Sequence, residues 1–585
     1  MFDVKHLDEV RSYMKKDGLK AYLVVTGDPH DSEEPAPYFG AERKWFCPFS
    51  GDNAFLLITL DKAFLWTDGR FFISAAQELK DSTIELMKMG TAGYPTLDEY
   101  VHGNHLYPLG TNETMISPSF LKGLTHKDSV IVDKDYSFLV KDRPALCDEK
   151  IWKFDDPKYN TLTREEKIAN IRKEIEKKDA EAHLITTLDD IAWILNLRGN
   201  DVECTPVFYS YLYISLKEGV HLFVNPKRID YEIKGVTIHP YEDIDKFLKE
   251  HSEVPTLADE TKCNAHVYNI LKHPVNGRAP SNLMKAIKGP VEIENIRSIQ
   301  EEDGVALLKF IAFIDKNKDK KLNEWQYAEE LGKYRAEGKR FFELSFTTIA
   351  ACGPNAAMMH YAPSKDVHSV VDPDNTIELL VDSGGQYYGG TTDTTRTFLI
   401  GKPTEEYIHD YTLTLKAVIN LSRTIFLEGS SGTTIDIRAR EIMWEEGMDY
   451  KCGTGHGVGY VLPVHEGPNG FRYRAAAGKD DQSQNVPGMV TTIEPGVYKE
   501  GKYGIRIENN LLTVPAFKTT DGQFYKFETI TYVPIETKAL DLSLLSDEEI
   551  KWLNDYHKEV YDRLSKHVDG ELLTVLKDKT RPIHR

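Results

Sequence analysis

Four carboxylates and one imidazole in the C-terminal half of the chain have the types and contexts of metal ligands. Oxygen donors with a single imidazole suit Mn²⁺ or a similar divalent ion better than a structural zinc site, which favours Cys. Four carboxylates balance the charge of two dications and leave room for a bridging hydroxide, so the set predicts a two-metal site for hydrolysis. The five residues are Asp382, Asp393, His456, Glu494 and Glu508.

The first two carboxylates lie in the segment IELLVDSGGQYYGGTTDTTRTFLI. The apolar run 377–381 ends on Asp382, two glycines follow, and Asp393 opens a Thr-rich run. This pattern predicts a hairpin with a carboxylate on each arm. Buried carboxylates at strand ends need a cation, an arginine or many donors, because unpaired burial is costly. Arg396 is the arginine nearby in the sequence that competes with a cation as the partner of these carboxylates.

The remaining ligand candidates have glycine-rich, turn or strand contexts. His456 lies in GTGHGVG, whose glycines let a backbone approach a ligand closely. Glu494 follows an apolar run and precedes Pro-Gly, where a strand breaks into a turn. In GIRIEN, the two-residue period of a strand puts both isoleucines on one face and Arg506 with Glu508 on the other. We expect the isoleucine face to be core and the other face to carry chemistry.

The C-terminal half resembles a known family. The strings GPNAAMMHYAP, LLVDSGGQYYGGTTDTTRTF, GTGHGVGYVLPVHEGPNG, TIEPGVY and GIRIEN are similar to the blocks of the Xaa-Pro aminopeptidases (aminopeptidase P) in their larger, three-domain form. The resemblance begins near Lys288 and continues, more loosely, through the N-terminal half. It implies a pita-bread catalytic fold with a dinuclear, usually manganese, centre. The implied activity is removal of the N-terminal residue from peptides that have proline second.

The resemblance also assigns roles residue by residue. The family's metal ligands fall on the five residues named above. His360 in MMHYAP and His465 in VHEGP match histidines that the family places beside substrate, and Arg506 is a third catalytic candidate. Either histidine would protonate the leaving prolyl nitrogen or stabilise the tetrahedral intermediate. The expected substrate-binding residues are Arg70 (in LWTDGRF), His360, His456, His465 and Glu494.

Two segments depart from the family pattern. Cys452 stands where many relatives carry a His in H-G-T-G-H. This is not a ligand position, so the change affects only a hydrogen bond around the ligands. CPFSGDNAF replaces a Gly- and Ser-rich turn of the relatives in the N-terminal part.

The chain of 585 residues exceeds a single core and contains a weak internal repeat. VRSYMKKDGLKAYLVVTGD and IRKEIEKKDAEAHLITTLDD both indicate a helix, Lys-Lys-Asp and an apolar strand, and KAFLWTDGRF and GVHLFVNPKRI indicate matching later strands. We predict two creatinase-like α/β domains, 1–157 and 158–288, with the polar segment 153–166 as their linker. A pita-bread catalytic domain of α+β type is expected over 289–585.

Helical patterns surround the ligand-bearing strands of the third domain. Pro290 suits the first position of a helix with an apolar stripe, and further helices are expected over 405–426 and 434–446. DKNKDKKLNEWQ, from Asp315, mimics an EF-hand loop, but Lys occupies the position that needs Gly, and Gln replaces the final Glu. We therefore interpret Asn323 as a helix cap.

Composition limits the classes of partner. The net charge of −20 argues against nucleic acid and anionic membranes. The six cysteines form no CxxC motif, which favours reduced thiols and a cytoplasmic location. The first residues predict an amphipathic helix instead of a signal peptide, and no apolar run reaches the roughly 18 residues of a membrane span. The resemblance implies a homodimer, with Trp444 as a candidate contact or, alternatively, a core residue.

Two other functions remain open at this point. A prolidase that cleaves Xaa-Pro dipeptides shares the catalytic fold, but its usual form lacks the middle domain. A non-catalytic pita-bread binding module would belong to a different class, and the five retained ligand types argue against it. Metal content separates the enzyme from a binding module, because the enzyme should hold close to two ions per chain and a binding module need not carry metal.

Overall fold

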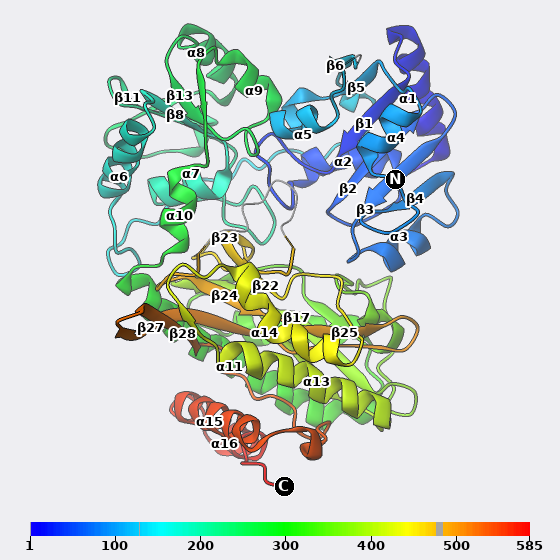
Figure 1. Ribbon diagram of the computed structural model, residues 1–585, viewed down its shortest axis with the longest axis vertical. Coiled ribbons are helices and arrows are strands. Elements are labelled where there is room, and N and C mark those ends of the chain that lie inside the picture. Colours follow the sequence, from blue (N-terminus) through cyan, green and yellow to red (C-terminus); the bar gives the residue numbers. More distant parts are fainter. Residues whose placement is uncertain (1, 128, 475–483) are drawn as a thin grey trace. The chain divides into compact units, whose positions relative to one another are not determined.

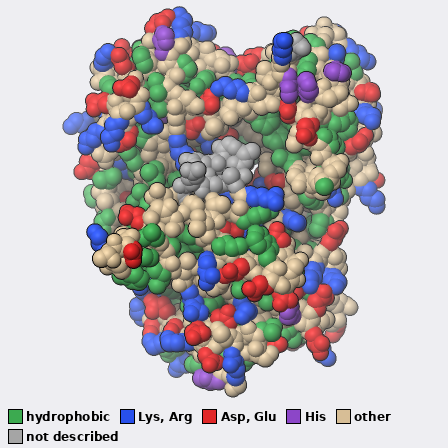
Figure 2. Space-filling model, viewed as in Figure 1, with side chains coloured by type: hydrophobic (Ala, Val, Ile, Leu, Met, Phe, Trp, Pro, Cys, Tyr) green, Lys and Arg blue, Asp and Glu red, His purple; other side chains and the backbone are tan. Residues whose placement is uncertain are grey.

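The computed structural model describes residues 2–127, 129–474 and 484–585. The chain divides into two compact units (Figure 1). The first comprises residues 1–155 and 162–282, and the second comprises 156–161 and 283–585. On the face shown in Figure 2, acidic and basic side chains are interspersed. The excess negative charge is therefore not gathered in one area of that face.

The first unit contains two six-stranded sheets. In spatial order, the first sheet consists of β4 (Ile84–Lys88), β3 (Ala63–Thr67), β2 (Ala54–Thr59), β1 (Ala21–Val25), β5 (Leu109–Thr111) and β6 (Ile131–Asp133). The second consists of β12 (Val236–His239), β11 (Gly219–Phe223), β10 (Tyr211–Ser215), β8 (Ala182–Ile185), β13 (Thr256–Ala258) and β14 (Pro274–Asn276). Strands β7 (Trp152–Lys153) and β9 (Leu197–Arg198) form a separate two-stranded sheet.

The two large sheets have the same topology, which confirms the predicted repeat. β1 pairs antiparallel with β2 and parallel with β5, and β8 pairs antiparallel with β10 and parallel with β13. The outer pairs β3–β4 and β11–β12 are both parallel. The strands predicted in KAFLWTDGRF and GVHLFVNPKRI are β3 and β11, so they occupy equivalent places in the two copies.

Short helices accompany these sheets. The predicted N-terminal helix is α1 (Val4–Asp17), whose apolar stripe buries Leu7, Val10 and Met14. The stripe follows the helical period, so burial of one face stabilises the helix. The other helices are α2 (Pro37–Phe46), α3 (Phe72–Glu78), α4 (Leu97–Gly103), α5 (Pro118–Gly123), α6 (Arg164–Lys177), α7 (Leu188–Leu195), α8 (Ile244–Glu250), α9 (Ala265–Ile270) and α10 (Pro280–Ala286).

The helices of the second unit begin largely where the sequence predicts. α11 (Pro290–Asn317) has Pro290 at its first position, and α12 (Glu324–Ala336) is capped by the Asn323 side chain. The cap confirms the interpretation of Asn323 as the N-cap of this helix. The second unit also contains α13 (Glu405–Ser422), α14 (Gly432–Glu445), α15 (Asp547–Leu564) and α16 (Gly570–Lys579).

The predicted helix over 405–426 is four residues too long at its end. α13 stops at Ser422, and residues 425–427 form strand β21 (Ile425–Leu427), which pairs with β28 (Gly522–Thr529). Isoleucine and phenylalanine favour strands when a partner strand is present. Trp444 on α14 is 43% exposed, so the interpretation of this side chain as core is wrong.

All five ligand candidates lie within or directly beside strands of the second unit. Its largest sheet has the order β21, β28, β27 (Asn509–Thr519), β24 (Val490–Ile493), β22 (Gly455–Gly457) and β23 (Glu466–Phe471). The smaller ones are β16 (Ile349–Ala351), β17 (Glu378–Ser383) and β20 (Thr394–Leu399); β15 (Phe341–Leu344), β18 (Gly385–Tyr387) and β19 (Gly390–Thr391); and β25 (Gly496–Lys499) with β26 (Tyr503–Arg506).

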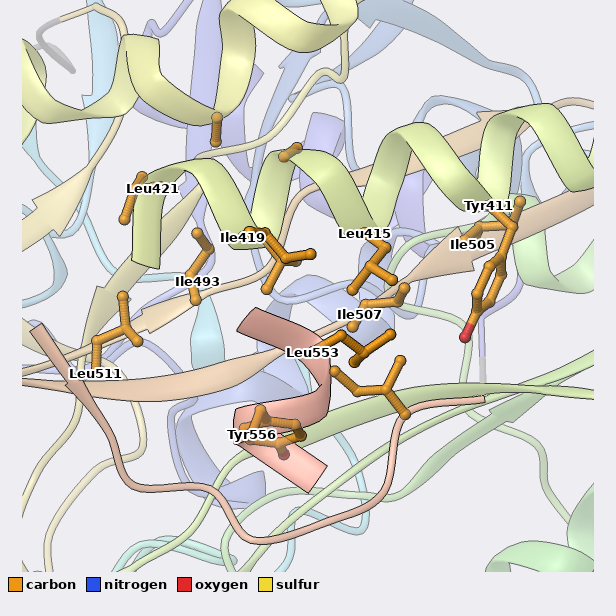
Figure 3. Packing of buried hydrophobic residues seen from close by; sticks show 14 of the residues in the cluster. Tyr411, Leu415, Ile419, Leu421, Ile493, Ile505, Ile507, Leu511, Leu553 and Tyr556 are labelled. Carbon is orange, nitrogen blue, oxygen red and sulfur yellow. The ribbon is translucent and has the colours of Figure 1, made fainter. Parts of the chain in front are cut away.

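Helices α13 and α15 cover the apolar side of these strands (Figure 3). Leu415 and Ile419 of α13 belong to one buried cluster with Ile505 and Ile507, and Leu553 of α15 joins it. Both isoleucines are 0% exposed, which confirms the predicted core face of GIRIEN. The opposite face is therefore free to carry polar groups.

The segment that precedes α6 is anchored on the second unit. Thr161 donates its backbone N–H to Glu292 of α11 at 2.9 Å, and the Asn295 side chain donates to the Lys158 carbonyl at 2.7 Å. Residues 156–161 of the predicted linker therefore belong to the second unit. All six cysteines are free thiols. Among the described residues, none of the helices has the length and apolar character required to cross a bilayer.

Candidate metal centre

The five ligand candidates lie at strand ends and edges of the second unit. Asp382 is on β17, where it pairs with Thr395 of β20. Asp393 is the residue immediately before β20. His456 is the middle residue of β22, Glu494 follows β24, and Glu508 lies between β26 and β27. The predicted hairpin is thus formed by β17 and β20, with β18 and β19 between them.

Chain folding brings these residues together. Ligand atoms of Asp393, His456 and Glu508 all lie within 4.8 Å of one another. His456 Nε2 lies 3.3 Å from Asp393 Oδ2 and 3.5 Å from Glu494 Oε1. Burial raises the pKa of the Asp382 carboxyl, and repulsion by Asp393 adds to the shift. Asp382 therefore lies near enough to the group to be affected by its charge.

Backbone contacts orient the imidazole. His456 Nδ1 lies 2.9 Å from the carbonyl oxygen of Gly457, which can only accept a hydrogen bond, so Nδ1 carries the proton. In the neutral ring with this tautomer, Nε2 is the nitrogen without a proton, and it faces the carboxylates, as a metal-binding histidine requires. A side chain at Gly455 would place its Cβ 1.9 Å from the Thr492 carbonyl oxygen, so only glycine permits this close strand pairing.

Arg506 connects two of the carboxylates. Its Nη2 donates to Asp382 Oδ2 at 2.7 Å, and its Nε donates to Thr395 Oγ1 at 3.1 Å. Thr395 in turn donates to Glu508 Oε2 at 2.8 Å, and Tyr498 accepts from Arg506 Nη1 at 2.8 Å. One buried guanidinium therefore orients Asp382 directly and Glu508 through a threonine.

Arg396, the arginine considered as an alternative to a cation, does not pair with the Asp382 or Asp393 carboxylate. Arg396 donates to the Tyr556 hydroxyl at 2.8 Å and to the backbone carbonyls of Val533 and Glu508. It lies on the opposite face of β20 from Thr395 because neighbouring strand residues alternate. Arg396 thus supports the backbone at Glu508, and Arg506 pairs with the carboxylate of Asp382.

Burial and mutual repulsion act on the carboxylates. Burial raises the pKa of Glu508 well above its ordinary value, and repulsion by Asp393 adds to the shift. Burial also raises the pKa of Glu494. Asp382 Oδ1 is buried and accepts no hydrogen bond from the described residues. A group of crowded carboxylates with an unused oxygen, and with an imidazole nitrogen that faces them, fits divalent cations, which would neutralise the negative charge.

The other predicted residues occupy three separate segments. The His465 ring stands edge-on to the His456 ring, with centroids 4.2 Å apart. His360 is half-buried and follows the 3₁₀ turn Gly353–Ala357. Arg70 lies in the first unit, where its Nε and Nη2 pair with Asp68 at 2.9 and 2.8 Å.

Sequence reasoning missed the residues that support the ligands. Thr395 bonds to Glu508, and Thr492 donates to Glu494 at 3.4 Å while accepting from the His456 backbone at 3.0 Å. The two-residue period contained this signal, since Thr395 and Thr492 each lie two positions from a predicted ligand. Tyr498 had no such signal, because its contact with Arg506 depends on the pairing of β25 with β26.

Glu378, at the start of β17, provides a test of pH-dependent stability. It is 0% exposed, and neither carboxylate oxygen accepts a hydrogen bond within the described residues. Burial raises its pKa from 4.5 to about 8. The folded state therefore holds a proton that the unfolded state releases, so this stability is present below pH 4.5 and is lost as the pH rises towards 8.

We expect Glu378→Gln to unfold at a higher temperature than the wild type above pH 8, with little difference at pH 5. The gain by pH 9 should be on the order of a few kcal/mol, since one pKa unit corresponds to about 1.4 kcal/mol. Thermal melts from pH 5 to 9 measure it. Glu528→Gln, at a half-exposed ion pair with Arg297, is the control. Parallel pH dependence in the wild type and Glu378→Gln would contradict the assignment.

Sequence profiles match the chain along its length. Metallopeptidase family M24 matches residues 294–515, and the C-terminal region of peptidase M24 matches 523–583. The Creatinase/Prolidase N-terminal domain matches twice, over 6–136 and 142–292. Two creatinase-type domains followed by a pita-bread catalytic domain are thus the fold, as predicted.

Full-length relatives agree with the profiles. A probable Xaa-Pro aminopeptidase P from Coprinopsis cinerea is 36% identical over 99% of this chain and 98% of its own length. One from Sordaria macrospora is 38% identical over 97% of both chains. The crystal structure of an X-prolyl aminopeptidase from Caenorhabditis elegans, described as a cytosolic enzyme with a di-nuclear active site, covers 99% of both chains with 32% identity and a TM-score of 0.92.

Prolidases share only part of this architecture. The prolidase from Pyrococcus horikoshii is similar over 63% of this chain and 99% of its own, with 23% identity and a TM-score of 0.51, a likeness of fold alone. The full-length matches are therefore the informative ones. The chain belongs to metallopeptidase family M24 and, within it, to the Xaa-Pro aminopeptidase P group.

Proposed function

We propose that this chain is a metal-dependent aminopeptidase that hydrolyses the N-terminal Xaa-Pro bond of peptides. The observation that carries the proposal is the buried cluster of Asp393, His456 and Glu508, with Glu494 and Asp382 beside it. The relatives that match nearly the whole chain are named for the same activity. We further propose the division into domains 1–157, 158–288 and 289–585.

The five clustered residues would hold two divalent ions, and we propose Mn²⁺ because oxygen donors with one imidazole suit it. When bound, such ions supply water activated at neutral pH and an electrophile for the scissile carbonyl. His456 offers Nε2, since its Nδ1 is committed to the Gly457 carbonyl. Arg506 acts as a positioning residue, because it bonds to Asp382 and, through Thr395, fixes Glu508.

Proton transfer and charge stabilisation are assigned to His360 and His465. The prolyl nitrogen is a poor leaving group until it is protonated, so a donor must lie beside it. His465 stands against the ring of His456 and therefore lies next to the proposed ions. Substrate contacts by His456 and Glu494 would follow from their place in the same cluster.

The test is hydrolysis of bradykinin-like peptides with Xaa-Pro ends, beside Xaa-Ala peptides and Xaa-Pro dipeptides, with and without Mn²⁺. We expect Mn²⁺-dependent release of the first residue from the Xaa-Pro peptides and close to two ions per chain. Cleavage of dipeptides alone would favour a prolidase, and absence of both metal and turnover would favour a binding module. Turnover with Zn²⁺ or Co²⁺ but not Mn²⁺ would reject the metal assignment.

Arg70 is proposed to contact substrate, on the basis of the resemblance. A charge-assisted hydrogen bond contributes about 1.5–3 kcal/mol, so Arg70→Ala should lower kcat/KM for long peptides by about tenfold or more. Kinetics on peptides of increasing length measure the effect. Arg11→Ala, which removes another arginine of the same domain, is the matched control. Unchanged KM and kcat at every length would remove Arg70 from the site.

We also propose that the chain acts in the cytoplasm as a homodimer. The C. elegans enzyme is described as cytosolic, which supports the location. Trp444, which donates to Asp449 at 3.1 Å and remains 43% exposed, is the candidate contact. Sedimentation velocity of the wild type and Trp444→Ala tests both the dimer and this contact.

A further inference from the structure

Glu324 is a buried carboxylate held by neutral donors. It is 0% exposed and occupies the first position of α12, where the helix dipole favours negative charge. Its carboxylate accepts from two backbone N–H groups, one amide and one hydroxyl. The donors are Cys352 N at 2.8 Å, Asn355 Nδ2 at 3.1 and 3.0 Å, Tyr361 OH at 2.7 Å and Ser369 N at 2.7 Å.

All four donors belong to the single segment 352–369, which carries His360. Tyr361 directly follows the histidine and donates the shortest side-chain hydrogen bond of the set. Asn355 also donates to Ser369 Oγ at 2.9 Å, so the two ends of the segment are bonded to each other as well as to Glu324. The carboxylate therefore fixes the segment on both sides of His360.

The same segment is held from its other side by the strand that precedes Glu508. A Cβ at Gly504 of β26 would lie 1.8 Å from the Ala356 carbonyl oxygen, so segment and strand meet in backbone contact. Arg506 Nη2 donates to the carbonyl of Met359 at 3.5 Å and to Asp382 at 2.7 Å. Glu324 and Arg506 thus hold the residues next to His360 from two directions.

We propose that Glu324 is a positioning residue, which fixes the segment around His360 relative to the metal-ligand cluster. The inference rests on the proposed function, because it assigns the catalytic effect of Glu324 to His360. Its physical basis is that a histidine acting on the leaving nitrogen must be held in hydrogen-bond reach, and small displacements lower the rate.

The mildest test is Tyr361→Phe, which removes one hydroxyl and keeps the ring that packs against the small cluster around Ile349 and Leu380. We expect kcat to fall by about tenfold, with KM and metal content unchanged. Glu324→Gln should lower kcat by about 10², because an amide offers one accepting oxygen where the carboxylate offers two. Tyr525→Phe removes a comparable hydroxyl–carboxylate bond, to Glu428 at 3.0 Å, and should leave kcat unchanged.

A double-mutant cycle with His360→Ala separates positioning from a general structural role. If Tyr361 and Glu324 act through His360, Tyr361→Phe in the His360→Ala background should change kcat by less than about twofold. An undiminished effect in that background would overturn the proposal. So would wild-type kcat in both Tyr361→Phe and Glu324→Gln.

Hydrogen exchange provides a readout that needs no activity. In Glu324→Gln, backbone amides of residues 352–369 should exchange faster than in the wild type, because two of them are bonded to the carboxylate. Unchanged exchange in this segment would overturn the proposal even if the enzyme assay failed. Absence of wild-type turnover on Xaa-Pro peptides would instead overturn the proposed function, so the two failures are distinguishable.

Discussion

Asp393→Asn and Glu508→Gln are each expected to abolish Xaa-Pro hydrolysis and to lower the metal content below two ions per chain. Both residues belong to the group of ligand atoms that lie within 4.8 Å of one another. An amide keeps the shape of the side chain but loses the charge that attracts a dication. Loss of residues that only support ligands costs about 10–100-fold, so loss of a ligand should lower activity by more than about 10².

The chain should remain folded in both variants. Burial and repulsion by Asp393 raise the pKa of Glu508 because both disfavour its charged form, and an amide at this position carries no charge to bury. Elemental analysis, turnover and thermal melts in Mn²⁺ measure the three quantities. Glu406→Gln, which removes a surface carboxylate bonded to Lys499 and Lys502, is the control. Wild-type turnover with two ions in either site variant would reject the dinuclear assignment.

Local sequence patterns predict the ligand-bearing segments well, because each ligand lies within or directly beside a short strand. The period of GIRIEN predicts that Ile505 and Ile507 are core, and both are fully buried under α13. The repeat in the N-terminal half predicts two similar sheets, and the strand pairings are the same in both. These features depend on residues that are close in the sequence, where periodicity and turn chemistry apply.

Features that depend on pairing between distant segments escape such reasoning. Arg396 lies three residues from Asp393, yet the alternation of β20 turns it away, and Asp382 pairs with Arg506 from another strand. The end of α13 is set by pairing of β21 with β28, about 100 residues later, and not by helix propensity. The sequence around Glu324 does not indicate its role, because its hydrogen-bond donors lie on a distant segment of the chain that begins with Cys352.

His360 and His465 are the residues that we propose protonate the leaving prolyl nitrogen and stabilise the developing charge. Attack of hydroxide on a prolyl amide creates an oxyanion and a nitrogen that must be protonated, and cations alone supply no proton. His360→Ala and His465→Ala should each lower kcat by on the order of 10² or more, with metal content preserved. Both residues lie in the second unit, His465 with its ring centroid 4.2 Å from that of His456.

The pattern of losses assigns a role to each histidine. A proton donor acts only in the transition state, so its removal should lower kcat and kcat/KM equally and leave KM unchanged. His409→Ala, which removes a half-exposed histidine of α13 beside Asp410, is the matched control. Loss of metal in His465→Ala would identify His465 as a metal ligand, which its position beside His456 would permit. Near-normal kcat in the alanine variant of either histidine would remove that histidine from catalysis. Because His360 is held through Tyr361, its loss should also abolish the effect of Tyr361→Phe, which links proton transfer to the buried Glu324 carboxylate.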